Sequence, residues 1–261
     1  MKIPIYQVDA FTNHPFFGNQ AAVCVLDEWL EDGVLQNIAA ENNLAETAFF
    51  VKDSDEYSLR WFSPVVEIDL CGHATLASAY IIFEFLEVTR NEVSFNTKSG
   101  KLTVTKSDDG QLVMDLPSRM PIKAEITQTI IDAFNAEPLE VWQSRDLMVI
   151  FDTEKTIKNI VPDIGKISEI KDSFAVIVTA KGDEVDFVSR FFAPNAGIPE
   201  DPVTGSAHST LIPFWADRLG KKKLHAKQLS QRGGELFCED EGERVRIGGF
   251  ASLFKKGEIY L

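Results

Sequence analysis

The sequence predicts an α+β protein with two pseudo-symmetric lobes, each a β-barrel-like sheet wrapped around a central helix. Three observations lead to this fold class: an internal repeat near half the chain length, one strongly apolar helix in each half, and short alternating strand patterns around both helices. A helix that is apolar on nearly all sides must be enclosed, and the strands are the available enclosure. We place the boundary near residue 120, which gives an N-terminal lobe 1–120 and a C-terminal lobe 121–261, with the active site expected between them.

The repeat consists of four matches that occur in the same order. Arg60–Pro64 recurs as Arg190–Pro194 at an offset of 130, and Gly100–Val104 resembles Gly234–Cys238 at an offset of 134. Between these matches, each half has a glycine followed by an apolar helix, and each later has an acidic-residue–glycine pair typical of a hairpin turn. The helix starts can be aligned on the glycines or on the histidines, and the sequence leaves both alignments open.

The predicted elements follow from hydrophobic periodicity. Ala74–Leu86 is apolar nearly all round and is expected to be a buried helix, and Ser206–Arg218 is its counterpart, which Pro213 should bend or shorten. A surface helix is expected over Leu30–Asn43, and a mostly helical connection over Met120–Glu137. The strands expected in the first half are Ile3–Phe11, Ala21–Leu26, Thr47–Val51, Ser58–Phe62, Val93–Thr97, Leu102–Thr105 and Leu112–Leu116.

Charge and cysteine content narrow the class of protein. A net charge of −14 argues against nucleic acid as a partner, and the run Lys221–Lys223 is interpreted as a solvated helix end. The three cysteines form no C-x-x-C pair, which is typical of a reduced, cytoplasmic protein without a disulfide framework. No leader is evident, and no apolar run reaches the roughly 18 residues of a membrane span. We expect a small-molecule partner, with neither nucleic acid nor membrane.

The two glycines that open the apolar helices mark the expected anion-binding positions. The N-terminus of a helix presents unsatisfied N–H groups and a partial positive charge, which suit a carboxylate or a developing enolate. Gly72 and Gly205 are therefore substrate-binding candidates, with simple turn glycines as the alternative. Asn19, which follows Gly18 in a turn, is a further candidate because its polar side chain could be aimed at the site.

Glu46 and His73 are the candidate proton-transfer residues of the first half. Glu46 lies where a helix gives way to an apolar strand, and burial would raise the pKa of such a carboxyl toward the range of a general acid/base. The alternative is an edge glutamate that faces water. His73 lies in the first turn of the buried helix, where it could relay a proton or pack as an ordinary core histidine.

The second helix start offers Asp201 and Ser206, which could equally be ordinary helix-start residues. Cys71 could be an activated thiolate at a helix N-terminus, but a two-cysteine racemase needs a second thiol, and Asp201 stands at that position. No phosphate-binding glycine motif occurs, and the four histidines show no metal-ligand spacing. We therefore expect neither cofactor nor metal.

Five motifs, spread over essentially the whole chain, resemble the phenazine-biosynthesis PhzF-like family, whose fold is shared with diaminopimelate epimerase. They are Tyr6–Phe11, Gly18–Val23, Asn43–Phe49, Cys71–Thr75 and Glu200–His208. The resemblance implies two lobes, each a barrel of strands around a central helix, and commonly a homodimer.

By the same resemblance, Glu46 falls on the acid/base that removes a proton from a cyclohexadiene carboxylate and returns it elsewhere on the same face. His73, Asp201 and Ser206 fall on the supporting polar residues. The expected function is thus a cofactor-independent isomerase acting on a small, cyclic carboxylate. The alternatives are a racemase or epimerase assisted by Cys71, and a carboxylate-binding protein without turnover.

Overall fold

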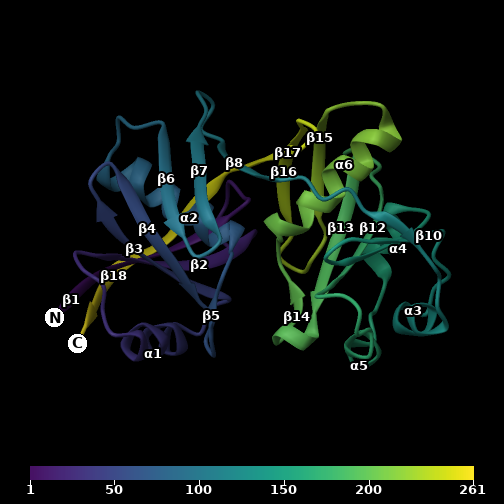
Figure 1. Ribbon diagram of the computed structural model, residues 1–261, viewed down its shortest axis with the longest axis horizontal. Coiled ribbons are helices and arrows are strands. Elements are labelled where there is room, and N and C mark those ends of the chain that lie inside the picture. Colours follow the sequence, from purple (N-terminus) through teal and green to yellow (C-terminus); the bar gives the residue numbers. More distant parts are fainter. The chain divides into compact units, whose positions relative to one another are not determined.

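The computed structural model describes residues 1–261, which form two compact units (Figure 1). Unit 1 comprises Met1–Asp115 together with Gly248–Leu261, and unit 2 comprises Leu116–Ile247. The C-terminal segment belongs to unit 1 because its strand β18 (Ala251–Tyr260) pairs antiparallel with β1 (Lys2–Ala10) along the whole of β1. The predicted boundary near residue 120 assigned all of 121–261 to one lobe. No local pattern in the sequence reveals which strand the last strand pairs with.

The strands of unit 1 form a mixed sheet in which β2 and β3 run parallel, as do β4 and β6. The pairings along this sheet connect β18, β1, β2, β3, β4, β6, β7 and β8. The remaining pairs are antiparallel. The further strands are β2 (Asn19–Leu26), β3 (Glu46–Asp53), β4 (Glu56–Phe62), β5 (Glu67–Ile68), β6 (Glu92–Thr97), β7 (Gly100–Lys106) and β8 (Leu112–Pro117).

The central helix of unit 1 is α2 (Gly72–Ile81), which continues as the π-helical turn η1 (Ile82–Leu86). It packs against β1, β2 and β3, and eight of its ten residues are buried. Ser78 donates its hydroxyl hydrogen to the Ala74 carbonyl, so the polar side chain is satisfied inside the enclosed helix. The outer face of the same strands is covered by α1 (Asp32–Asn42). The sequence thus predicted both helices of this unit.

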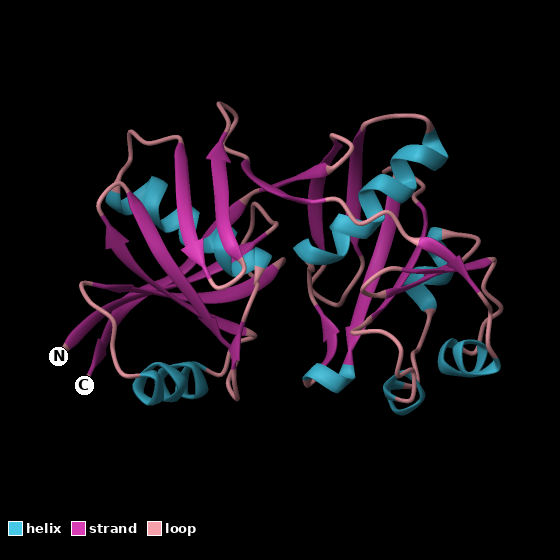
Figure 2. Cartoon of the chain, viewed as in Figure 1, coloured by secondary structure: helices cyan, strands magenta, loops and turns pink.

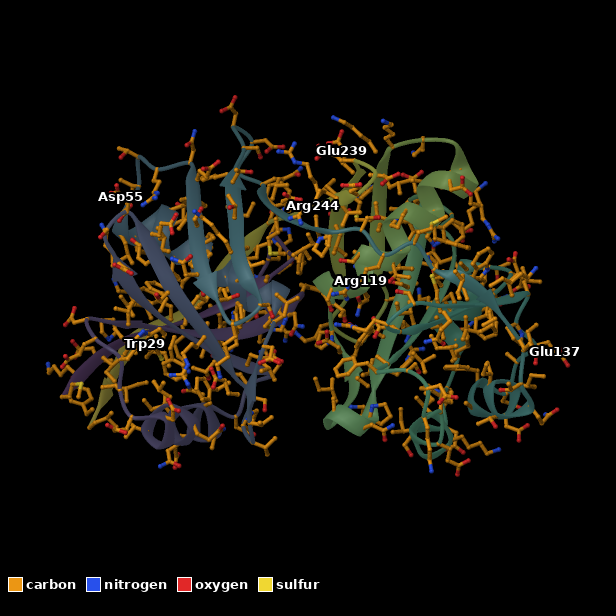
Figure 3. All side chains as sticks on the ribbon, viewed as in Figure 1. Trp29, Asp55, Arg119, Glu137, Glu239 and Arg244 are labelled. Atoms are coloured by element: carbon orange, nitrogen blue, oxygen red, sulfur yellow. The ribbon has the colours of Figure 1, made fainter.

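Unit 2 repeats the pairing order with β9, β10, β11, β12, β13, β15 and β16, again with two parallel pairs, β11–β12 and β13–β15. Figure 2 shows that each unit has a helix running among its strands, and Figure 3 shows side chains filling the space around it. The strands are β9 (Ile122–Ala124), β10 (Glu140–Gln143), β11 (Leu147–Ile150), β12 (Val176–Lys181), β13 (Phe187–Ala193), β14 (Ile198–Asp201), β15 (Lys223–Gln228), β16 (Gly234–Asp240) and β17 (Arg244–Gly249).

The repeated arginine has the same structural task in both units. In unit 1, Arg60 Nε and Nη2 bind the two carboxylate oxygens of Glu67 at 2.7 and 2.9 Å. In unit 2, Arg190 binds Glu200 in the same forked manner at 2.7 and 3.0 Å. Each pair ties one long strand, β4 or β13, to the short strand that leads into the central helix. The bidentate geometry fixes the orientation of both side chains, so the helix start is held in the same way twice.

The two helix starts also match in detail. Cys71 and Thr204 precede the helical turns in extended conformations, at φ −135° and −112°. Four residues later, the Thr75 hydroxyl donates to the Cys71 carbonyl, and the His208 ring nitrogen Nδ1 bonds to the Thr204 carbonyl. This correspondence supports the alignment on the two glycines rather than on the two histidines.

The second central helix differs from the predicted one. A 3₁₀ turn, η3 (Gly205–Ala207), precedes the α-helix α6 (His208–Leu219), so Gly205 does not open a regular helix. Pro213 lies inside α6 without ending it. Because Pro213 has no N–H, the Ser209 carbonyl is free of its helical partner and instead accepts the backbone N–H of Arg119 at 2.8 Å.

The segment Met120–Glu137 was predicted to be mostly helical, and this was wrong for its first part. Ile122–Ala124 is strand β9, which pairs antiparallel with β10, while helix α3 covers only Gln128–Phe134. Pairing with a distant strand overrides the local pattern here. Two other short helices, α4 (Glu154–Asn159) and α5 (Ile164–Ser168), complete unit 2. No helix is long and apolar enough to cross a membrane.

Gly18 provides a test of the turn that leads into β2. Its φ is +67°, and a Cβ atom at this position would lie 2.1 Å from the Ala10 carbonyl oxygen. We expect Gly18→Ala to lower the free energy of unfolding by about 2 kcal/mol or more, measured as a shift of the urea midpoint by tryptophan fluorescence. Gly100→Ala is the matched control, because Gly100 also has positive φ but open space around it. An equal loss in both variants would contradict the steric explanation.

Candidate active site

Three elements of unit 1 bring Asn19, Glu46 and His73 together. Asn19 and Glu46 are the first residues of the adjacent parallel strands β2 and β3, and Ala21 of β2 lies opposite Glu46. His73 is the second residue of α2, which packs against both strands. Because parallel strands begin at the same end of a sheet, the two polar side chains meet the start of the buried helix there.

Local structure explains why Glu46 occupies this position. Helix α1 ends at Asn43, which adopts the left-handed conformation (φ 47°, ψ 39°) and donates its N–H to the Ala39 carbonyl. Asparagine tolerates this conformation better than most residues, so the chain can leave the helix within one turn. Strand β3 then begins at Glu46, and the residues that follow it are buried as far as Phe50.

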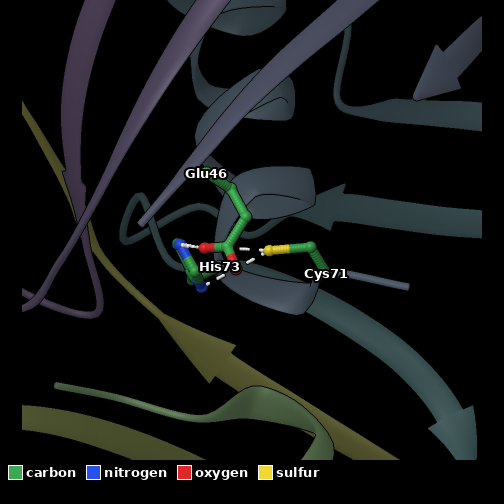
Figure 4. Close-up of side chains that lie close together, drawn as sticks. All are labelled: Glu46, Cys71 and His73. Carbon is green, nitrogen blue, oxygen red and sulfur yellow. Dashed lines mark hydrogen bonds and ion pairs between the residues drawn. The ribbon is translucent and has the colours of Figure 1, made fainter. Parts of the chain in front are cut away.

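The site is a buried acid–base pair (Figure 4). Glu46 Oε2 lies 2.9 Å from His73 Nε2, and the two residues are each only 5 % exposed. Although this distance makes an ion pair, Oε2 has no aligned hydrogen bond. Asn19, which is 1 % exposed, has its amide nitrogen 3.1 Å from His73 Nδ1. The predicted water-facing alternative for Glu46 is therefore wrong.

The contacts of the His73 ring determine which nitrogen faces the carboxylate as a donor. When Nδ1 accepts the Asn19 amide hydrogen, the neutral ring carries its proton on Nε2, toward Glu46. If the Asn19 amide is rotated so that its oxygen faces the ring, that oxygen can accept a hydrogen bond from a protonated Nδ1 of His73. Burial by itself would lower the pKa of His73, but its interactions with Cys71 and with the carboxylate of Glu46 outweigh this and raise that pKa well above its usual value of 6.5.

Cys71 is the third member of the cluster and is not activated. Its Sγ lies 3.5 Å from His73 Nδ1 and 3.9 Å from Nε2. Burial, followed by the charge of Glu46, raises the pKa of Cys71 to about 11. The thiol is therefore neutral near pH 7, unlike the low-pKa thiolate that a catalytic cysteine requires. The other two cysteines, Cys24 and Cys238, are also buried and free, with pKa values raised by burial.

Glu46, Cys71 and His73 are also residue types that bind zinc, and their ligand atoms lie within 4.8 Å of one another. However, the carboxylate and imidazole are in direct contact at 2.9 Å. Two ligands of a tetrahedral zinc ion, each about 2.0 Å from the metal, would be more than 3 Å apart. The geometry is that of an acid–base pair rather than of a prepared metal centre.

The predicted residues of the second half lie on one loop of unit 2. Asp201 ends β14 and is 7 % exposed, and the Thr204 hydroxyl donates to its Oδ2. The Gln228 side chain donates to the Asp201 carbonyl at 2.8 Å and accepts the Thr204 N–H at 2.9 Å. Thr204 and Gln228 thus hold the loop. Gln228 was not predicted, because it is distant along the chain and belongs to no motif.

Ser206 lies in the 3₁₀ turn that Gly205 opens, and its hydroxyl accepts a hydrogen bond from Arg145 Nη2 at 3.3 Å. Arg145 was also missed, because an isolated arginine before a short apolar strand carries no distinctive pattern. A shallow hollow of about 390 Å³ elsewhere in unit 2, between α3 and α4, contains none of the predicted residues. Its lining includes Asn135, Lys155 and Asn159.

Two strand-rich units with matching pairing order, each around a helix, define an epimerase-type fold, and the acid–base pair marks it as suited to proton chemistry. A hydroxyproline epimerase from Agrobacterium vitis has the same fold, with a TM-score of 0.64 at 10 % identity, over 99 % of this chain and 92 % of that one. This likeness confirms the predicted fold class.

The chain belongs to the PhzC-PhzF family of phenazine biosynthesis-like proteins, whose model matches residues 8–257. It is similar to an uncharacterized isomerase of Pseudomonas aeruginosa, with 47 % identity over 100 % of both chains. It is also similar to a PhzF-family protein from Enterococcus faecalis, with a TM-score of 0.98, 48 % identity and complete coverage of both chains. The expected family is confirmed, and the chain is an isomerase.

The two buried histidines should titrate in opposite directions. Because the pKa of His73 is raised in the folded protein, its stabilising contribution is complete below the unfolded value of about 6.5 and is lost as pH rises through the folded pKa. Burial lowers the pKa of His208 to about 4, so its contribution is present above 6.5 and is lost as pH falls. We expect histidine ring NMR shifts to show a protonated His73 and a neutral His208 at pH 7.

Ring signals are assigned with His73→Gln and His208→Gln. A His73 signal that titrates at or below the usual histidine value of 6.5 would contradict the proposed influence of the Glu46 carboxylate on the ring.

Proposed function

We propose that this isomerase moves a proton on a small, cyclic carboxylate substrate without a cofactor, with Glu46 as the acid/base. The observation that carries the proposal is the Glu46 carboxylate, which is only 5 % exposed and whose Oε2 lies 2.9 Å from His73 Nε2. Buried carboxylates that face a titratable partner are typical of sites that transfer protons.

In the proposed reaction, Glu46 takes a proton from a carbon next to the unsaturated system of the substrate. The C–H bond breaks, its electron pair enters the conjugated system, and a new O–H bond forms on Glu46. While it is held on the carboxyl group, this proton can exchange with solvent. Glu46 then delivers a proton to another carbon of the same face, so that atoms and electrons balance and no oxidant is needed. A general acid/base of this kind typically contributes 10²–10⁴-fold to the rate.

His73 and Asn19 support this cycle. The Nε2 hydrogen of His73 faces the carboxylate, and Asn19 fixes the ring from its other side at 3.1 Å. The start of α2 adds N–H groups without a side-chain cap at Gly72, and these suit the negative charge that develops on the substrate. A single side chain is thus sufficient for both removal and return of the proton.

Glu46→Gln should abolish the exchange of substrate hydrogen with solvent. The amide has nearly the same shape but cannot accept the proton, so we expect exchange in deuterated water to fall by about 10²-fold or more, measured by mass spectrometry with a panel of cyclic carboxylates. Glu41→Gln, an exposed change on α1, is the control and should leave exchange unchanged. Equal exchange in wild type and Glu46→Gln would contradict the role of Glu46. Binding without exchange in the wild type would favour a carboxylate-binding protein.

Cys71→Ala separates this mechanism from a cysteine-assisted racemase or epimerase. The pKa of the Cys71 thiol is raised to about 11, so the variant should keep its exchange rate within a few-fold of the wild type. Circular dichroism of the product shows whether configuration is inverted. A loss comparable to that of Glu46→Gln would instead identify the thiol as a base.

Asp201 and Ser206 of unit 2 are proposed to act on the substrate as supporting polar residues, with Gly205, the first residue of the 3₁₀ turn, beside them. Their support is the resemblance of their motif and the network that fixes their loop. We also retain the homodimer and the cytoplasmic location as proposals. Light scattering of the purified full-length chain measures the first, and fractionation of cells measures the second.

A further inference from the structure

The strand pairing of unit 1 near Glu46 can be compared with the equivalent strand pairing of unit 2. Thr47 lies opposite Phe62, and Val176 lies opposite Phe192. The two phenylalanines are equivalent, because each supports the repeated arginine over its ring at 5.1 Å. Thr47 and Val176 therefore occupy equivalent positions in β3 and β12.

One residue earlier in these strands, Glu46 of unit 1 corresponds to Ala175 of unit 2. The strand next to Glu46 has Ala21 at this level, whereas the strand next to Ala175 has Asp146, because the β11–β12 ladder begins with the following pair. Unit 2 therefore also has a buried carboxylate at this level, on the neighbouring strand. Asp146 is only 1 % exposed.

The Asp146 carboxylate is paired with an arginine, which stays charged near neutral pH, whereas Glu46 is paired with a histidine, which can titrate. Arg145 binds both oxygens of Asp146, at 3.0 and 2.9 Å, and reaches the hydroxyl of Ser206 at 3.3 Å. Ser206 is the counterpart of His73 in the alignment on the glycines. A guanidinium does not release its proton near neutral pH, so unit 2 retains the charge of the pair and loses its capacity for proton transfer.

Arg119 adds a second guanidinium to this region, and the only carboxylate that acts on it is Asp146, which Arg145 already binds. The backbone of Arg119 is fixed by its hydrogen bond to Ser209, and its half-buried side chain forms neither ion pair nor hydrogen bond. Burial, followed by the positive charge of Arg145, lowers the pKa of Arg119. Two guanidiniums thus share the one carboxylate of Asp146, in a chain whose net charge is −14. A partly desolvated cation without an anion is costly unless a ligand supplies one.

We propose that Arg119, together with Arg145 and Ser206, binds the carboxylate of the substrate. Guanidinium groups present parallel donors that match the two oxygens of a carboxylate, and the hydroxyl adds a third donor. This proposal rests on the proposed function, since it takes Ser206 as part of the substrate site.

The test measures binding to the full-length chain by isothermal titration calorimetry with benzoate and cyclohex-1-enecarboxylate, with benzamide as the uncharged counterpart and inorganic phosphate as another anion. Arg119→Gln should raise the Kd of the carboxylates by about tenfold or more, because it removes a charged hydrogen bond. Arg119→Lys should lose less, since it keeps the charge but not the fork. The control is Arg246→Gln, an exposed change in the same unit, which should have no effect.

Three outcomes would overturn the proposal: no carboxylate binds the wild type, phosphate binds in preference to carboxylates, or Arg119→Gln binds carboxylates as the wild type does. The variant Glu46→Gln distinguishes a failure of the proposed carboxylate site from a failure of the proposed function. It should bind the carboxylate probes as the wild type does but lose the exchange of substrate hydrogen with solvent. Exchange that persists in Arg119→Gln with unchanged KM would overturn the role of Arg119 and leave Glu46 as the acid/base.

Discussion

The contact between Glu46 and His73 is the constraint on which unit 1 depends, because two groups that can carry charge are placed where water has little access. Their burial is tolerable only while each faces the other, and this requires the start of α2 to meet the starts of β2 and β3. The enclosure of α2 therefore also places His73 beside Glu46. The position of this helix sets the 2.9 Å distance, and the forked pair of Arg60 with Glu67 holds the strand that leads into it.

The same scaffold carries different chemistry in the two units. Both have a forked arginine–glutamate pair, an extended residue before the helical turn and a side chain that bonds back to its carbonyl. At the level of Glu46, however, unit 2 has Ala175, and its carboxylate, Asp146, is occupied by Arg145. The fold is thus repeated, while the buried carboxylate at this level faces a histidine in unit 1 and an arginine in unit 2.

Most of the fold could be predicted from the sequence because its signals are local or repeated. The offset of 130 between Arg60 and Arg190 reflects a structural task that is repeated in both units, and the apolar run after Gly72 predicts an enclosed helix. The partner of β18 and the strand Ile122–Ala124 could not be predicted, since long-range pairing decides both. Glu46, His73 and Asn19 were recognisable because they belong to short sequence motifs. Gln228 and Arg145 act through long-range contacts that no short pattern encodes.

Pro213 shows how a local irregularity can serve a site. In a regular helix the Ser209 carbonyl would accept the N–H four residues later, but that residue is Pro213 and has none. The carbonyl instead accepts the N–H of Arg119, from the segment that enters unit 2 after β8. The bond fixes the backbone of an arginine whose side chain has no counter-ion. The sequence predicted that Pro213 would bend or shorten the helix. The helix α6 continues through Pro213 to Leu219, and the carbonyl that Pro213 leaves without its helical partner anchors another segment.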